Sequence, residues 1–396
     1  MNPGDSGGDG PAWDPARDAA SPARRRLHPA VGAARNAVKA ALEEAGWPSV
    51  VLVACSGGPD SLALAAAVAH FARRGSVRAP GGGRHPLRAG AVVVDHQLQE
   101  GSGDVARTTA AVLAGLGLAP VRVVAVEVRA EGEGPEAAAR AARHAALTQE
   151  AQALGAGAVL LGHTLDDQAE QVLLGLARGS GPRALGAMRR VRGLFLRPFL
   201  GLRRAETLEI CAAEGLAPWF DPTNEDPRFM RSRVRSSVMP FLEAELGPGV
   251  AEALARTAAL LGADADLLDT HAQRAYESLA EVVPAEPVSA AAAPAEATAR
   301  AGTGPRAVVL PGDALRELPS ALRGRVIALA VAELGGEATY ERLRAVERLL
   351  DRRGSAGPVE VPGHVSAYRQ TASAHAAGTR GISPGAPGAL VLVSHR

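Results

Sequence analysis

A regular alternation of apolar strand-like runs with helix-like segments between residues 50 and 179 limits what this chain can fold into. The four apolar runs span residues 50–53, 89–98, 121–128 and 156–163, and the clearest helical patterns span 135–155 and 166–179. Strands that alternate with helices of this length form βαβ units, which place the strands parallel in one sheet. The sequence therefore predicts an α/β fold with a doubly wound parallel sheet. In such sheets ligands bind beyond the carboxyl ends of the strands.

The first strand ends in Ser-Gly-Gly-Pro-Asp-Ser, which leads directly into an apolar helix. Gly57 and Gly58 can adopt backbone conformations that are closed to other residues, and Pro59 suits the first turn of a helix. A glycine loop at a helix N-terminus presents free N–H groups and a positive dipole end to an anion. Asp60 would repel a phosphate unless a cation lay between them, so the stretch fits a magnesium–phosphate complex. The residues predicted to contact this complex are Ser56, Gly57, Gly58, Pro59, Asp60 and Ser61.

This loop differs from the ordinary P-loop. The P-loop needs a lysine that reaches the β- and γ-phosphates, and Lys39 is the only lysine in this chain. The alternative interpretation is a tight strand-to-helix turn that binds no ligand. Because a bare turn does not need two serines and an aspartate together, the sequence favours the anion site.

A second group of polar residues follows the last of the four strands, in the stretch Gly-His-Thr-Leu-Asp-Asp. His163 lies at the strand end, and Asp167 and Glu170 lie three residues apart on the next helix. The aspartates of this stretch could instead cap the N-terminus of that helix. Arg140 and Arg143 share one face of the preceding helix, where they would either reach a phosphate or form a solvated surface.

Composition narrows the class of protein and its compartment. The chain has 396 residues, of which 47% are hydrophobic, and this is enough for two domains with buried cores. Its 2 cysteines show no metal-binding or redox spacing, which predicts a reducing, cytoplasmic location. No apolar run approaches the ~18 residues that a membrane span requires, and the N-terminus lacks the apolar core of a secretory signal. No membrane association is therefore expected.

The charge is distributed unevenly along the chain, although the formal net charge is only +1. Residues 178–236 contain twelve arginines and six acidic residues, which gives this segment a formal charge of +6. Such a local excess is typical of a polyanion-binding surface, but a solvated basic face gives the same count. Three alternating arginines near its end are predicted phosphate contacts: Arg231, Arg233 and Arg235.

Shifts in composition divide the chain into segments. Residues 1–30 are predicted to form a disordered tail, and residues 31–245 contain the strand–helix alternation and the candidate site. Residues 250–396 are predicted to form a smaller, mainly helical domain, with two short strands near its end. Within it, residues 281–307 are rich in alanine and proline and predict a flexible insert.

Taken together, these motifs resemble those of bacterial tRNA(Ile)-lysidine synthetases, a family of the PP-loop ATP pyrophosphatase superfamily. The Ser-Gly-Gly-Pro-Asp-Ser loop is typical of the whole superfamily. The narrower resemblance rests on Asp-Asp-Gln-Ala-Glu at 166–170, Arg-Gly-Ser-Gly at 178–181, and Asn-Glu-Asp at 224–226 with the alternating arginines that follow. It covers residues 49–245 well and the C-terminal region only by its layout. It implies a PP-loop, adenine nucleotide α-hydrolase-like fold, followed by a tRNA-binding domain.

The resemblance also implies a reaction. A ligase of this family joins lysine to the wobble cytidine of the CAU anticodon of isoleucine tRNA, forming a C–N bond. ATP adenylates the carbonyl oxygen at position 2 of the base and releases pyrophosphate. The ε-amino group of free L-lysine then attacks that carbon and expels AMP. ATP and Mg²⁺ are the implied cofactors, and the sequence leaves open whether the chain acts as a homodimer.

The resemblance implies roles for particular residues of this chain. Asp60 and Asp167 would hold magnesium, His163 would contact the α-phosphate or the base, and Glu170 would hold the ammonium of substrate lysine or accept its proton. At least one of the two arginines on the 135–155 helix would reach a phosphate or the activated base. The implied catalytic set is Asp60, Arg140, Arg143, His163, Asp167 and Glu170, and the implied tRNA contacts are Arg231, Arg233 and Arg235.

Two other functions remain open from the sequence. A different PP-loop ATP pyrophosphatase, such as an ammonia ligase, would share the glycine loop, although the basic segment weighs against it. A non-catalytic tRNA-binding protein with a vestigial nucleotide site would share the basic segment. The intact loop and its acidic residues argue against such decay.

Overall fold

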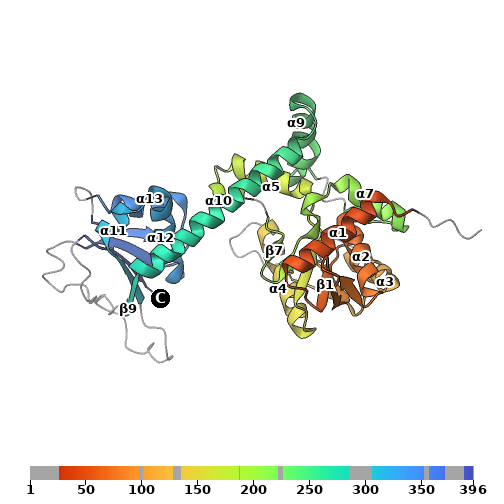
Figure 1. The fold of residues 1–396 in the computed structure, drawn as a ribbon. Coiled ribbons are helices and arrows are strands. Elements are labelled where there is room, and N and C mark those ends of the chain that lie inside the picture. The colour runs from red at the N-terminus through yellow and green to blue at the C-terminus, as the bar shows by residue number, and fades with distance from the viewer. Residues whose placement is uncertain are drawn as a thin grey trace, which may run out of the picture. The chain divides into compact units, whose positions relative to one another are not determined.

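The computed structural model describes residues 26–97, 101–127, 135–186, 188–221, 226–284, 306–351, 356–370 and 388–395 (Figure 1). The chain divides into two compact units, residues 1–258 and 259–396. Residues 1–25 of the predicted tail lie outside the described residues, whereas helix α1 already begins at Pro29. No helix in the described part of the chain is both long and apolar enough to cross a membrane.

The first unit is built on a six-stranded sheet, as the strand–helix alternation predicts. Its strand order is β5-β4-β1-β6-β8-β7, and every neighbouring pair is parallel except β7 with β8. The strands are β1 (Val50–Ala54), β4 (Arg88–Asp95), β5 (Val121–Ala125), β6 (Ala158–Leu161), β7 (Val191–Arg192) and β8 (Phe195–Leu196). A separate hairpin joins β2 (Ser76–Arg78) to β3 (Arg84–Pro86). The predicted α/β fold with a parallel sheet is confirmed.

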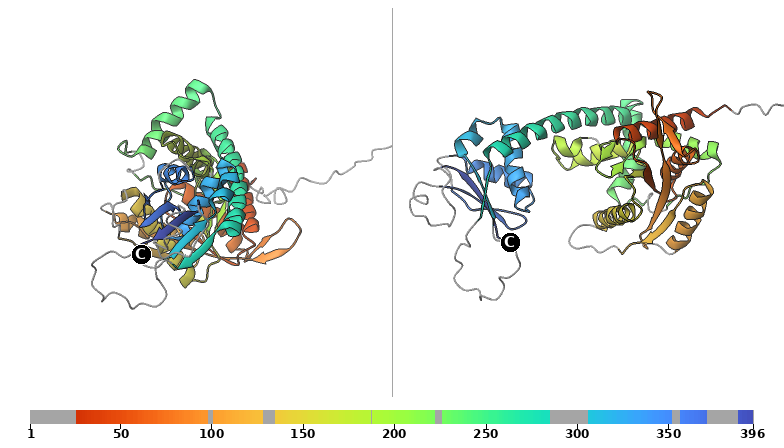
Figure 2. Two further views of the ribbon diagram at one scale, coloured as in Figure 1. Left: turned by 90° about the vertical axis from the view of Figure 1, so that its left-hand side faces the viewer. Right: turned by 60° about the horizontal axis from the view of Figure 1, so that its bottom comes forward.

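Helices cover both faces of this sheet, as Figure 2 shows from two further directions. On strand β1, Val51 and Val53 belong to one hydrophobic cluster, while Leu52 packs in a second cluster on the other face. The first cluster includes residues of α1 (Pro29–Glu44), α2 (Pro59–Ala72) and α3 (Ser102–Gly115), and the second includes residues of α4 (Pro135–Ala153). Burial of β1 on both faces explains its continuous apolar run.

The first unit also contains shorter helices and turns after β6. These are α5 (Leu165–Ala177), α6 (Pro182–Leu185), the 3₁₀ turn η1 (Pro198–Gly201), α7 (Arg204–Glu214), α8 (Met230–Arg233), the π-helical turn η3 (Val234–Val238) and α9 (Met239–Leu246). Helices α8, η3 and α9 follow one another without a break. A π-helical turn within a helix is often found at a functional site.

The second unit contains a five-stranded antiparallel sheet in addition to helices. Its strand order is β11-β12-β13-β10-β9. The strands are β9 (Glu281–Pro284), β10 (Arg306–Leu310), β11 (Val359–Val361), β12 (Val365–Arg369) and β13 (Leu390–Ser394), and the helices α11 (Gly312–Glu317), α12 (Ser320–Glu333) and α13 (Tyr340–Arg348) follow β10. Helix α10 (Val250–Leu279) begins in the first unit and ends in the second.

This sheet bears on two sequence predictions. The smaller second domain is confirmed, and its described residues contain more helix than strand, but its sheet has five strands where the sequence predicts two. The predicted flexible insert at 281–307 has strands at both ends, where Arg306 pairs with Pro284 and Ala307 pairs with Val283. Residues 285–305 lie outside the described residues. The prediction is therefore corrected only at the two ends of the insert, because β9 begins at Glu281 and β10 begins at Arg306.

Candidate active site

The glycine loop between β1 and α2 has a backbone that only glycine fits. Gly57 has a φ of +84°, and a Cβ built on it would lie 2.6 Å from the hydroxyl oxygen of Thr109. The carbonyl oxygen of Gly57 accepts a hydrogen bond from the backbone N–H of Trp219, at 2.9 Å. Gly58 is the N-cap residue of α2, and Pro59 occupies the first turn of that helix. The predicted strand–loop–helix motif is therefore present.

The two serines of the loop differ in their surroundings. Ser61 is buried, and its hydroxyl donates to the carbonyl of Gly58 at 3.0 Å and accepts from the backbone N–H of Ser56 at 3.2 Å. Ser61 thus closes the loop on itself. Ser56 is exposed, which leaves its side chain accessible to a ligand.

Both cysteines of the chain pack against this loop. The Cys55 thiol contacts the hydroxyl of Ser61 at 3.3 Å, and the Cys211 thiol contacts the carbonyl oxygen of Pro59 at 3.4 Å. Both residues are free thiols, and burial raises the pKa of Cys55 and raises the pKa of Cys211 to about 11. The thiols are therefore structural neighbours of the loop and are protonated near neutral pH.

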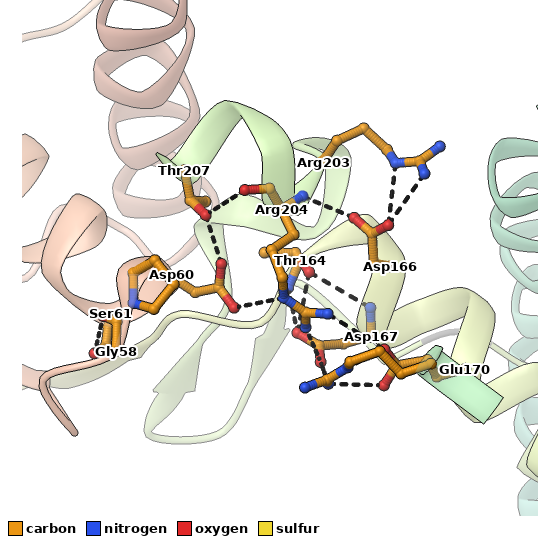
Figure 3. Close-up of polar contacts among 12 residues, drawn as sticks. Gly58, Asp60, Ser61, Thr164, Asp166, Asp167, Glu170, Arg203, Arg204 and Thr207 are labelled. Carbon is orange, nitrogen blue, oxygen red and sulfur yellow. Dashed lines mark hydrogen bonds and ion pairs between the residues drawn. The ribbon is translucent and has the colours of Figure 1, made fainter. Parts of the chain in front are cut away.

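Asp60 extends from the first turn of α2 towards α7. Its Oδ1 accepts a hydrogen bond from the Thr207 hydroxyl at 2.6 Å, and its Oδ2 accepts one from Arg204 Nε at 3.2 Å (Figure 3). Burial raises the pKa of Asp60 and outweighs the opposing effects of Arg204 and Thr207. Gly162, which follows β6, lets the backbone of Asp60 lie close to it, since a Cβ on Gly162 would lie 2.9 Å from the Asp60 carbonyl oxygen.

Asp167 has two roles, one for each carboxylate oxygen. Its Oδ2 accepts the backbone N–H of Thr164 at 2.8 Å, which forms a capping box at the start of α5. Its Oδ1 accepts hydrogen bonds from Arg204 and Arg231, both at 3.1 Å. Burial tends to raise the pKa of Asp167, but Arg204, Arg231 and His163 reverse the effect and lower it. The capping role predicted as an alternative is thus combined with a charged contact.

Glu170 lies one turn further along α5 and is almost fully buried, with 1% of its surface exposed. Its Oε1 accepts a hydrogen bond from Arg235 Nε at 2.7 Å, and its Oε2 accepts one from Arg231 Nε at 3.0 Å. Arg204 approaches the same carboxylate at 3.4 Å. A buried carboxylate of this kind is stable only with such charged partners.

Arg204 joins the three carboxylates and is absent from the predicted site residues. Its guanidinium group contacts Asp60, Asp167 and Glu170, and its backbone N–H donates to Asp166 at 2.7 Å. The neighbouring Arg203 contacts Asp166 at 3.1 Å. Two arginines at a helix N-terminus oppose the helix dipole, and this conflict is the signal in the sequence that could have indicated a special role.

The alternating arginines fall into two groups. Arg231 and Arg235 contact the carboxylates of Asp167 and Glu170, whereas Arg233 donates to the backbone carbonyls of Pro227 and Arg228, at 2.7 and 3.1 Å. The spacing explains the division, because residues four apart share a helix face and the residue between them points elsewhere. None of these contacts tests the predicted role in tRNA binding.

The remaining predicted residues lie in a cationic region beside the carboxylates. Burial, with Arg197, Arg143 and Arg231, lowers the pKa of His163 despite the opposing effect of Asp167. The buried Nδ1 of this histidine has no hydrogen-bond partner within the described residues. Burial and the neighbouring Arg140 lower the pKa of Arg143. His163 and Arg143 therefore lie close enough for the guanidinium charge to affect the pKa of the imidazole.

The two predicted magnesium ligands are compatible with that metal. Asp60 and Asp167 are hard oxygen donors that converge on one cation, the Arg204 guanidinium. Within the described residues, no group of three or more histidine, cysteine or acidic side chains could form a complete metal cage. Magnesium commonly binds through one or two carboxylates together with substrate phosphates, so a two-carboxylate site fits it.

The histidines of the first unit should make its stability depend on pH. Burial is the largest cause of the lowered pKa values of His70, to about 4, and of His96, His144 and His163. The unfolded chain takes up these protons near its ordinary histidine pKa of about 6.5, but the folded chain does not. The histidine contribution to the free energy of unfolding is therefore expected to be present above about pH 6.5 and to be lost as the pH falls towards the folded-state pKa of His70, about 4. Urea titrations across this range measure the slope, and His163→Gln should flatten it. If the free energy of unfolding of His163→Gln depended on pH as steeply as that of wild type, His163 would not contribute to the pH dependence.

A glycine loop between a parallel strand and a helix, with acidic residues beyond the ends of β1 and β6, defines a nucleotide-binding protein of the PP-loop class. Consistent with this, residues 33–242 match the PP-loop domain family, and residues 310–372 match the TilS substrate binding domain. Three similar proteins are each described as a tRNA(Ile)-lysidine synthase.

The similarity to these proteins extends over most of their length. The protein from Thermobifida fusca is 47% identical over 85% of this chain and 94% of its own length. The proteins from Leifsonia xyli and Mycobacterium tuberculosis are 49% and 44% identical, over 80% and 77% of this chain and 86% and 82% of their own lengths. The chain belongs to the tRNA(Ile)-lysidine synthase family.

Proposed function

We propose that the chain ligates lysine to the wobble cytidine of the CAU anticodon of isoleucine tRNA, using ATP and an adenylated base intermediate. The observation that carries this proposal is the convergence of Asp60, Asp167 and Glu170 on Arg204 beside the glycine loop. A nucleotide loop next to buried acidic residues suits a reaction between a nucleotide and a cationic substrate. Membership of the tRNA(Ile)-lysidine synthase family supports the same reaction.

In the first step, the oxygen at position 2 of the cytosine attacks the α-phosphorus of ATP and pyrophosphate leaves. The free N–H groups at the start of α2 and the exposed Ser56 hydroxyl would bind the departing phosphates. Asp60 and Asp167 would hold magnesium, which neutralises the charge on pyrophosphate when it is bound. Arg140, Arg143 and the neutral His163 would orient the α-phosphate or the base.

In the second step, the ε-amino group of lysine attacks carbon 2 of the activated base and AMP leaves. Lysine binds as an ammonium ion and must lose a proton before its nitrogen can attack. Glu170 is the candidate to hold this ammonium and accept its proton, since it is a buried carboxylate next to Asp167. Base catalysis of this kind typically contributes about 10²–10⁴ in rate.

The experiment that tests this function is a single-turnover assay with radiolabelled ATP, L-lysine and unmodified tRNA that carries a CAU anticodon. Lysidine formation with release of both pyrophosphate and AMP is the expected result. ATP cleavage that depends on ammonia and not on tRNA would instead indicate an ammonia ligase. Binding of tRNA without any ATP cleavage would indicate a non-catalytic tRNA-binding protein.

Arg233 offers a test of the tRNA surface that is separate from the carboxylates. Arg233 is exposed, and the described contacts of its guanidinium group are with backbone carbonyls. If it also reaches a tRNA phosphate, Arg233→Ala should weaken tRNA binding and reduce the log–log salt slope by about 0.7–0.9. The affinity for ATP should not change. Measurements of tRNA affinity at several salt concentrations check this, and an unchanged slope would rule out the phosphate contact.

A further inference from the structure

Three guanidinium groups form ion pairs with three carboxylates beside the glycine loop. The carboxylate cluster consists of Asp60, Asp167 and Glu170, which Figure 3 shows around Arg204. Its other two partners are Arg231 and Arg235. Each oxygen of Glu170 already accepts a hydrogen bond, from Arg231 or Arg235. Within the described residues, positive and negative charges in this cluster are therefore equal in number.

This balance conflicts with the binding of a lysine ammonium group. An ammonium near Glu170 would lie within a few ångströms of Arg231 and Arg235, which occupy the same oxygens. Like charges at such short distances repel each other, and the repulsion is stronger in a partly buried site than in water. The site must therefore lose a guanidinium group before it can bind lysine.

Arg204 contacts one more carboxylate of the cluster than either of the other two arginines does in the described contacts. It lies at the start of α7, its guanidinium group contacts all three carboxylates, and its backbone N–H is bound to Asp166. Arg231 and Arg235 come from α8 and the π-helical turn η3. Their side chains are 25% and 30% exposed, so an anion in solution can reach them.

Arg231 and Arg235 belong to the basic segment of residues 178–236. Arg231 and Arg235 are four residues apart and share a helix face. Arg228 and Arg233, which are close to them in the sequence, are exposed. Phosphate groups are bound most strongly by arginine, often through two parallel hydrogen bonds. A tRNA backbone that reaches this segment competes directly with the carboxylates for Arg231 and Arg235.

We propose that Arg231 and Arg235 are exchangeable counter-ions that close the ammonium site until tRNA phosphates draw them away from Asp167 and Glu170. This inference rests on the proposed function, and it adds an order of binding in which tRNA precedes lysine. The order has a chemical benefit. Free lysine has a carboxylate that could itself attack the α-phosphorus of ATP, and its exclusion before tRNA binds prevents this side reaction.

The test is calorimetric titration of the full chain with L-lysine, with and without tRNA that carries a CAU anticodon, in the absence of ATP. Wild-type protein is expected to bind lysine at least about tenfold more tightly with tRNA, which corresponds to about 1.4 kcal/mol. Arg235→Gln should bind lysine without tRNA at least about tenfold more tightly than wild type does. Arg235→Lys keeps the positive charge but loses the two-point contact with Glu170, so its lysine affinity without tRNA should lie between those of wild type and Arg235→Gln.

Arg233→Gln is the matched control, because it removes a guanidinium group from the same helical segment without removing a contact to Asp167 or Glu170. Its lysine affinity without tRNA should equal that of wild type. Circular dichroism establishes that each variant is folded, and Arg231→Gln provides a second test if Arg235→Gln does not fold.

The proposal is overturned if wild-type protein binds lysine equally well with and without tRNA, or if both glutamine variants bind it no more tightly. Failure of the proposed function gives a different result, since no lysidine would then form in the single-turnover assay. Normal lysidine formation together with tRNA-independent lysine binding would refute the counter-ion role alone.

Discussion

Asp60→Asn is expected to lower the rate of base adenylation by about 10²- to 10⁴-fold while the fold remains intact. Asp60 lies beside the glycine loop and is one of the two carboxylates that fit magnesium. Asparagine has nearly the same shape and can still accept the hydrogen bond from Thr207. Because burial raises the pKa of Asp60, its charged form does not stabilise the folded state, and the neutral variant should unfold at the same temperature or a higher one.

Pyrophosphate release in single turnover, together with thermal unfolding, measures both parts of this prediction. Asp104→Asn is a suitable control, since Asp104 is an exposed residue of α3 that pairs with Arg107. The control should keep the wild-type rate. A wild-type rate in Asp60→Asn would exclude the magnesium role, and a lower unfolding temperature would show that the charge contributes to folding.

Glu170→Gln is expected to separate the two half-reactions. If Glu170 binds the lysine ammonium and accepts its proton, the variant should still form adenylated tRNA and release pyrophosphate. Transfer of lysine should then be slower by about 10²-fold or more. Parallel measurements of pyrophosphate release and lysine incorporation reveal the difference.

Glutamine at this position also removes one of the charged partners of the nearby guanidinium groups, which keep their contacts with Asp167, so stability must be measured as well. Glu214→Gln removes another partly buried ion pair, that with Arg35 at 3.0 Å, and serves as the control for a general loss of stability. An equal decrease in both half-reactions would assign Glu170 to ATP or metal binding and not to lysine.

The sequence predicts the core of the first unit well because its signals are local. The run from Val51 to Val53 is buried, and Gly57 occupies a left-handed backbone conformation that other residues rarely adopt. Strands β7 and β8 were not predicted, since two residues are too few to show a period. The sheet of the second unit was underestimated for a related reason, because its strands are distant in sequence and most are flanked by Gly, Ala and Pro.

The candidate site could be predicted only in part. Asp60, Asp167 and Glu170 follow from their positions after strands, and the structure places all three around one guanidinium group. Arg204 could not be inferred, because its contact with Asp60 spans 144 positions and has no spacing rule. Likewise, the alternating arginines showed a positive surface but not that two of them contact acidic residues within the same chain.

The two cysteines beside the glycine loop have a practical consequence for spectroscopy. Thiol-reactive dyes and oxidants attack the thiolate form, and both Cys55 and Cys211 are buried with raised pKa values. An introduced cysteine can therefore be labelled without first replacing Cys55 and Cys211. A cysteine introduced at an exposed position of the helical segment from α8 to α9 can be coupled selectively to a fluorophore, so that movements of this segment can be followed in real time without altering the loop.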